Sequence, residues 1–147
     1  MSKSVLIVDD YAPIRVHMCS LIKEAGFKVC GEAGNGREAI EQALQLKPDL
    51  IVLDLAMPEM DGAEAALVLK KCLPQTPIIM FTLYADGLAD DLRRALNVEQ
   101  VVSKLDGMRV VIESIITLLG SSERQAGYTE TLNARRSPLR AGNDHVR

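Results

Sequence analysis

The sequence predicts an α/β fold in which five parallel strands form a doubly wound sheet with helices on both faces. Short runs rich in β-branched residues alternate with longer stretches of helical periodicity, and Gly, Pro and Asp separate them. Residues 50–53 and 78–81 are continuously apolar, as expected for strands covered on both faces. Because crossovers between parallel strands are right-handed, the intervening helices must lie on both faces of the sheet.

Each expected strand is a short apolar run bounded by polar or turn residues. The first ends in two aspartates, the second is the shortest, the third and fourth should be central because they are apolar throughout, and the fifth carries two valines. The expected strands are residues 5–8, 28–30, 50–53, 78–81 and 100–102.

The expected helices fill the intervals between these strands and follow the last one. The first and last show the clearest apolar stripe at helical spacing. The stripe of the first comprises Ile14, Met18, Leu21, Ile22 and Ala25, and that of the last comprises Met108, Val111, Ile112, Ile115 and Leu119. The expected helices are residues 13–25, 36–46, 63–72, 88–95 and 107–119.

The composition changes near residue 120. Residues 1–120 carry a net charge of −5 and are expected to form one domain, which is large enough to fold without a metal or disulfide staple. Residues 121–147 carry five arginines, three acids and few apolar side chains, for a net charge of +2. This composition predicts a flexible, disordered tail.

Several classes of protein are disfavoured by the composition. The net charge of −3 without a basic cluster argues against direct binding to nucleic acid. No stretch approaches the roughly 18 apolar residues of a membrane span. Three widely spaced cysteines, Cys19, Cys30 and Cys72, fit neither a disulfide framework nor a zinc site and are expected to be buried. We therefore expect a cytoplasmic protein without contact to a membrane.

Reactive side chains follow four of the five expected strands: Asp9 and Asp10, Asp54, Thr82, and Lys104. Asp9 and Asp10 alone would equally suit a helix cap. Because the carboxyl ends of parallel strands meet at one edge of a sheet, all five should share one cleft. Three carboxylates repel one another unless a cation neutralises them, and their hard oxygens suit Mg²⁺. With Lys104 and Mg²⁺ the cleft would be neutral and able to accept an anion such as a phosphoryl group.

Four segments resemble the receiver domain of bacterial two-component response regulators, and the resemblance covers residues 4–119. The segments are VLIVDDYAPIR at 5–15, DLIVLDLAMPEMDG at 49–62, TPIIMFT at 76–82 and VVSK at 101–104. The resemblance implies a flavodoxin-like sheet with the strand order 2-1-3-4-5. It also implies that Asp54 is the phosphoacceptor, which takes a phosphoryl group from a histidine kinase or a phosphotransfer protein.

The same resemblance assigns the other residues of the cleft. Asp10 and Asp54 would bind Mg²⁺ directly, Asp9 would bind it largely through water, and Ala56 would contribute its backbone carbonyl. Lys104 would pair with the phosphoryl oxygens. Thr82 would move toward them and report the modification.

The resemblance further implies a signalling switch rather than an enzyme. Phosphorylation would reshape the surface formed by the fourth helix, the fifth strand and the fifth helix, to which a downstream protein target binds. The 27 residues after the domain are too few for a DNA-binding output domain. Val110, with Ile116 and Leu118 beside it, is expected to face away from the core and could serve a homodimer.

Three positions depart from the family pattern. Val101 stands where the family usually has a switch aromatic, and Tyr84 could replace that aromatic or cover the phosphoryl group. Leu83 replaces a small residue after Thr82, and Leu105 replaces a proline after Lys104. These departures leave the geometry of the loops around the cleft open.

Two other functions stay open beside the phosphorylation-dependent switch. The chain could be a docking scaffold that works without phosphorylation, or it could pass phosphoryl groups onward as a relay or drain them as a sink. A phosphohydrolase of the haloacid dehalogenase type is disfavoured, because such a site needs a second aspartate two residues after its nucleophile. Tyr11 stands at that offset from Asp9.

Overall fold

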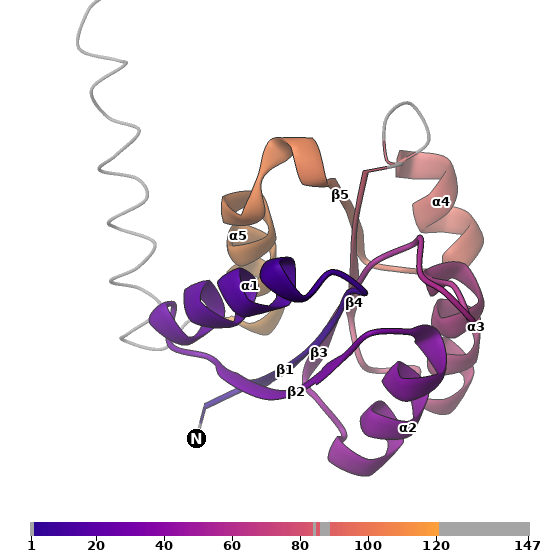
Figure 1. The fold of residues 1–147 in the computed structure, drawn as a ribbon, viewed down its shortest axis with the longest axis horizontal. Helices are drawn as coiled ribbons and strands as arrows, with labels where there is room; N and C mark the ends of the chain where they lie inside the picture. Colours follow the sequence, from indigo (N-terminus) through magenta and orange to yellow (C-terminus); the bar gives the residue numbers. More distant parts are fainter. Residues whose placement is uncertain (1, 84, 86–88, 121–147) are drawn as a thin grey trace, which may run out of the picture.

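A computed structural model describes residues 2–83, 85 and 89–120, and these residues form a five-stranded parallel sheet flanked by helices (Figure 1). The strand order is β2-β1-β3-β4-β5, as predicted. The strands are β1 (Ser4–Val8), β2 (Lys28–Ala33), β3 (Leu50–Leu53), β4 (Ile78–Thr82) and β5 (Gln100–Ser103). The helices are α1 (Ala12–Glu24), α2 (Gly36–Leu46), α3 (Gly62–Cys72), α4 (Ala89–Leu96) and α5 (Met108–Leu119), with a 3₁₀ turn, η1 (Lys104–Asp106), after β5.

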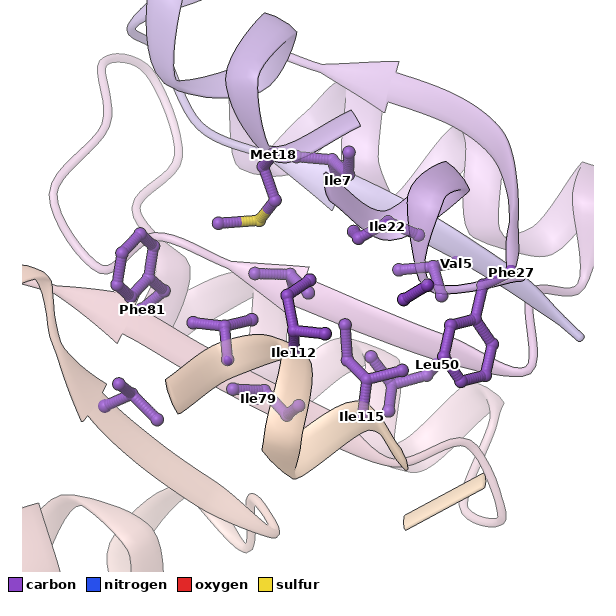
Figure 2. Close-up of a cluster of buried hydrophobic side chains, with 14 residues drawn as sticks. Val5, Ile7, Met18, Ile22, Phe27, Leu50, Ile79, Phe81, Ile112 and Ile115 are labelled. Carbon is purple, nitrogen blue, oxygen red and sulfur yellow. The ribbon is translucent and has the colours of Figure 1, made fainter. Parts of the chain in front are cut away.

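The sheet separates two hydrophobic cores. Helices α1 and α5 cover one face, and α2, α3 and α4 cover the other (Figure 1). Successive side chains of a strand point to opposite faces, so Val5 and Ile7 of β1 enter the first core while Leu6 and Val8 enter the second. Figure 2 shows the first core, where Ile112 of α5 packs toward the sheet. Burial on both faces explains why the central strands are apolar throughout.

The predicted apolar stripes of the first and last helices are confirmed. Met18 and Ile22 of α1 are buried, as are Val111, Ile112 and Ile115 of α5. The remaining members of the two stripes are buried or partly buried against the same core, namely Ile14, Leu21, Ala25, Met108 and Leu119.

Most differences from the predicted bounds are one residue at an end, but β2 is twice as long as expected. It continues to Ala33 because residues 31–33 pair with β1 after a register shift between Val5 and Leu6. Gly31 and Glu32 gave no strand signal, since β2 is an edge strand with polar positions. The predicted fourth helix began at residue 88, which lies outside the described residues, as does the predicted tail at 121–147.

Two predictions of burial are wrong. Cys72 is exposed at the end of α3, and Cys19 and Cys30 are only partly buried. Val110 does not face away from the core, because it is partly buried and packs against the first core with Ile116 and Leu118. The predicted apolar patch on α5 therefore contributes to the core, and no homodimer surface follows from it.

Candidate functional site

The predicted cleft forms at the carboxyl edge of the sheet. Asp9 follows β1, Asp54 follows β3, Thr82 ends β4 and Lys104 follows β5. The ammonium of Lys104 lies 2.7 Å from Asp9 Oδ2 and 3.2 Å from Asp54 Oδ2, so one cation joins the ends of three strands. Asp10 joins the same group, because Asp9, Asp10 and Asp54 each offer a carboxylate oxygen within 4.8 Å of the others.

The three carboxylates differ in their access to solvent. Asp9 and Asp54 are 3% and 5% exposed, whereas Asp10 is an exposed residue. Buried charges are retained only when they are paired or bind a cation. The two buried carboxylates share Lys104, which leaves an excess of negative charge in the cleft.

The charges of the cleft shift two pKa values. Burial raises the pKa of Asp54 above its usual value of 3.8, and the charge of Asp9 raises it further, while Lys104 opposes both effects. Burial alone would lower the pKa of Lys104, but its hydrogen bond to Asp9 and the charge of Asp54 outweigh burial and raise it. Lys104 is therefore a permanent cation, and Asp54 is a carboxylate that gains from additional positive charge.

Backbone hydrogen bonds hold Asp9 in place. Its N–H donates to the carbonyl of Ala33 at 3.0 Å, and its Oδ1 accepts from the N–H of Tyr11 at 2.9 Å. The carbonyl of Asp9 accepts from Nη1 of Arg15 at 2.6 Å, and Nε of Arg15 lies 3.4 Å from Glu32 of β2. Tyr11 is the N-cap residue of α1 and makes no side-chain cap bond, so the two aspartates are not helix caps.

A close backbone approach fixes the loop after Asp54. The N–H of Asp54 donates to the carbonyl of Val8, and the N–H of Gly62 donates to the carbonyl of Leu55 at 2.8 Å. A Cβ atom at position 62 would lie 2.0 Å from the carbonyl oxygen of Asp54. Only glycine can begin α3 this close to the loop.

Lys104 is positioned by the start of η1 and by an aromatic ring. Ser103 is the N-cap of η1, and its Oγ accepts from the N–H of Leu105 at 3.2 Å. The ammonium of Lys104 lies 5.9 Å from the centroid of the Phe81 ring, within the range of a cation–π contact. Lys104 thus reaches the carboxylates over a buried aromatic surface.

Three residues that support the cleft were not predicted from the sequence: Arg15, Gly62 and Phe81. Arg15 ends the first family segment, and Gly62 ends the second. Both positions were therefore visible, but their contacts with Asp9 and with the Asp54 loop depend on the folded chain. Phe81 lies in the third family segment, but it was predicted only as an apolar residue of a central strand.

An open cavity of about 400 Å³ lies beside the charged group, and Ala56 and Leu83 are in its lining. The full lining comprises Asp10, Tyr11, Ile14, Asp54, Ala56, Leu83 and Lys104. Thr82 is fully buried at the end of β4, and Val101 packs partly buried against the second core. Tyr84, which could have taken the place of the absent aromatic, lies outside the described residues.

Residues 5–115 match the family model of the response regulator receiver domain. The chain belongs to the response regulator receiver family. Its receiver domain is similar to protein-glutamate methylesterase/protein-glutamine glutaminase of Archaeoglobus fulgidus, with 40% identity over 127 residues, which are 85% of this chain and 36% of that protein. It is also similar to chemotaxis protein CheY of Thermotoga maritima, with 48% identity over 80 residues, which are 54% of this chain and 67% of CheY.

Solved structures agree with the receiver fold. The response regulator domain of Thermotoga maritima CheB superposes with a TM-score of 0.73 at 28% identity, covering 83% of this chain and 99% of that domain. CheY in the CheX-CheY-BeF₃-Mg²⁺ complex from Borrelia burgdorferi gives a TM-score of 0.74, covering 81% and 90% of the chains. At 21% identity this second likeness shows the fold alone.

The receiver domain places the chain in two-component signalling. The chain spans 36% of the methylesterase and 56% of the response regulator VraR of Staphylococcus aureus, to which it is 36% identical over 118 residues, 78% of this chain. Within the described residues, no helix is both long and apolar enough to cross a membrane.

Proposed function

We propose that Asp54 accepts a phosphoryl group from a phosphohistidine of a histidine kinase or phosphotransfer protein. The observation that carries the proposal is the buried Asp54 carboxylate, held 3.2 Å from Lys104 at the rim of an open cavity. A carboxylate oxygen of Asp54 would form the bond to phosphorus as the P–N bond of the donor breaks, and the imidazole would keep the electron pair. An ionised carboxylate needs no general base for this attack.

Mg²⁺ is the proposed cofactor. The oxygens of Asp9, Asp10 and Asp54 lie close enough together to share one cation, and hard carboxylate oxygens are the ligands that Mg²⁺ prefers. In this proposal Asp10 and Asp54 bind the ion directly, Asp9 binds it largely through water, and the backbone carbonyl of Ala56 completes the protein ligands. The bound ion would supply positive charge beside the phosphoryl oxygens.

Lys104 and Thr82 are proposed to interact with the transferred phosphoryl group. The ammonium of Lys104 already lies between Asp9 and Asp54, so a phosphoryl group on Asp54 would give it a more highly charged partner. Thr82 ends β4 directly before the connection to α4. A shift of Thr82 would therefore pass to α4, β5 and α5, the surface proposed to bind a downstream protein.

In this proposal the chain is a signalling phosphoacceptor and not an enzyme acting on a separate substrate. No direct contact with nucleic acid or a membrane is part of the proposal. The cytoplasm is the proposed compartment, and the free thiols of Cys19, Cys30 and Cys72 suit its reducing conditions. The domain is proposed to span residues 1–120.

A phosphorylation-independent docking scaffold is the second candidate. It is favoured by Val101, which packs against the second core where the family usually has a switch aromatic. In that case the surface of α4, β5 and α5 would bind its partner without modification of Asp54. Relay and sink roles require the same phosphorylation of Asp54 as the switch does.

Intact mass spectrometry after incubation with acetyl phosphate and Mg²⁺ tests the proposal. We expect a single phosphoryl adduct that is absent in Asp54→Asn and absent when EDTA removes the metal. Asp61→Asn is the matched control, because asparagine caps α3 as well as the aspartate that caps it now. If the wild-type protein forms no adduct, and beryllofluoride with Mg²⁺ also leaves its NMR spectrum unchanged, the docking scaffold is the better account.

A further inference from the structure

A second open cavity of about 400 Å³ lies between α1 and α5, which cover the same face of the sheet (Figure 1). Its volume is in the range of small-molecule sites. Leu21 of α1 and Met108 of α5 are partly buried in its walls, and the ring of Phe81, which is 3% exposed, forms its floor. Figure 2 shows Phe81 at the opposite end of the first core from Phe27. The interior of this cavity is therefore apolar and opens at one end of the core.

The ionisable side chains of this second cavity are all basic. Among the described residues that line it, they are His17, Lys104 and Arg109, and no carboxyl group is present, although the whole chain carries a net charge of −3. His17 and Arg109 are exposed and therefore lie at the mouth of the cavity. Within residues 2–83, 85 and 89–120, neither of these two forms a salt bridge. The cavity thus joins an apolar interior to a basic mouth.

Lys104 plays a different part, because it also lines the cavity beside Asp54. Its ammonium is bound to Asp9 and Asp54, so its aliphatic stem is what remains to contact an occupant of the second cavity. The positive charge available to a ligand in the second cavity therefore comes from Arg109, with the ring of His17 beside the same mouth as a hydrogen-bonding group.

We propose that the second cavity binds a small organic anion that carries a compact apolar body. The anionic group would lie against Arg109 and His17, and the apolar body would contact Leu21 and Met108. An inorganic anion would leave the apolar walls unused, since burial of apolar surface is favourable only against another apolar surface. A neutral apolar ligand would leave the charge of the arginine unused. This site is separate from the proposed phosphorylation and does not depend on it.

NMR titration with 2-naphthoate tests the proposal, and 2-naphthamide and acetate are the matched compounds. The naphthoate has both an apolar body and a charge, the amide has only the body, and acetate has little more than the charge. We expect saturable shifts of the Leu21, Met108 and Lys104 side-chain signals with the naphthoate. Its dissociation constant should be roughly three-fold lower than that of the amide, as for an exposed ion pair, and acetate should not saturate these signals.

Two kinds of variant assign the binding to the cavity. Arg109→Gln should abolish the difference between the naphthoate and the amide. Arg37→Gln is the matched control, because Arg37 is likewise an exposed second residue of its helix, α2, but lies outside the cavity lining. Leu21→Trp should weaken the binding of both compounds by roughly ten-fold, because the larger side chain occupies the apolar interior. Met108→Trp replaces it if Leu21→Trp does not fold.

The proposal is overturned if the naphthoate and the amide bind equally, if acetate binds as tightly as the naphthoate, or if the folded tryptophan variant keeps the wild-type affinity. It is also overturned if the Leu21 and Met108 signals shift with protein concentration alone, because a second copy of the chain then covers the cavity. None of these measurements uses a phosphoryl donor. Failure of this proposal therefore leaves the proposed phosphorylation of Asp54 unaffected, and failure of that phosphorylation leaves this proposal unaffected.

Discussion

At the scale of single residues, the cleft places the Asp54 carboxyl group where ionisation is unfavourable. Asp54 is nearly fully buried and lies close to the negative charge of Asp9. The ammonium of Lys104 is shared by both carboxylates. Burial and repulsion raise the pKa of Asp54, which means that the folded protein holds a proton there more tightly than the unfolded chain does. The same excess of negative charge makes the site receptive to a cation.

The raised pKa predicts how stability depends on pH. The raised pKa of Asp54 lowers the free energy of unfolding. This loss is absent below the usual pKa of 3.8, grows as the pH rises toward the raised pKa, and is complete above it. Asp54→Asn cannot ionise, so in EDTA-containing buffer at pH 7.5 this variant should unfold at a higher urea concentration than the wild type. The advantage should shrink as the pH falls toward 4. The prediction is contradicted if Asp54→Asn is less stable than the wild type at pH 7.5. It is also contradicted if the two proteins differ in their unfolding urea concentration by the same amount at both pH values.

Arg15 provides a second prediction, because its two contacts differ in environment. Its Nη1 donates to the carbonyl of the buried Asp9 at 2.6 Å, whereas its partner Glu32 is exposed. Hydrogen bonds from charged donors contribute about 1.5–3 kcal/mol, and exposed ion pairs contribute about 0–1 kcal/mol. Arg15→Met, which keeps the apolar stem, should therefore lower the free energy of unfolding by about 1–3 kcal/mol.

Glu32→Gln is the comparison for Arg15→Met and should cost less than about 1 kcal/mol. Urea unfolding of both variants measures the difference. Equal losses would mean that the ion pair, and not the hydrogen bond to Asp9, holds the arginine in place.

At the scale of elements, the start of α3 sets the loop that follows Asp54. Gly62 donates to Leu55, and its α-carbon lies against the backbone of Asp54. Asp61 caps the same helix through a hydrogen bond to the N–H of Glu64. The Asp61-Gly62 pair therefore lets a helix start directly against the loop that follows Asp54.

Gly62→Ala tests this arrangement. The added Cβ would meet the Asp54 carbonyl oxygen at 2.0 Å, so the loop or the helix must move. We expect a loss of about 1–3 kcal/mol in the free energy of unfolding, as for other overpacked sites, together with slower phosphorylation of Asp54. Gly34→Ala is the control, because its Cβ would meet nothing closer than 3.8 Å. If both variants behave like the wild type, the close approach at Gly62 has no effect on the site.

The elements differ in how far the sequence predicts them. Central strands such as β3 and β4 are apolar throughout, and these continuous apolar runs locate them within a residue. The end of β2 was missed because the pairing of Glu32 with β1 is a long-range contact that leaves no periodic signal. The short η1 turn, by contrast, is set locally, because Ser103 caps it at the point where Lys104 enters the cleft.

At the scale of the whole molecule, the site exists only when the sheet is assembled. Asp9, Asp54 and Lys104 are separated by up to 95 positions in the chain and meet because β1, β3 and β5 are parallel. Their convergence could be predicted from the strand ends and the family segments. The apolar walls of the cavity could not, because nothing in the pattern places Tyr11 and Leu83 on one cavity.

A site that forms only on folding links cation binding to global stability, which gives the last prediction. Mg²⁺ that binds the native chain and not the unfolded one should stabilise it by about 2.7 kcal/mol at 100 times its dissociation constant. For a domain of this size that corresponds to a rise of very roughly 10 °C in the melting temperature. Differential scanning calorimetry with and without MgCl₂ measures the rise, and NaCl at matched ionic strength controls for screening.

The expected pattern across variants assigns the ligands. Asp10→Asn removes an exposed carboxylate from the three that share a cation position and should lose most of the Mg²⁺-dependent rise. Asp61→Asn, outside that cluster, should keep it. If NaCl reproduces the rise in melting temperature, general screening accounts for the stabilisation. If Asp10→Asn retains the full Mg²⁺-dependent rise, the three aspartates do not form the cation site.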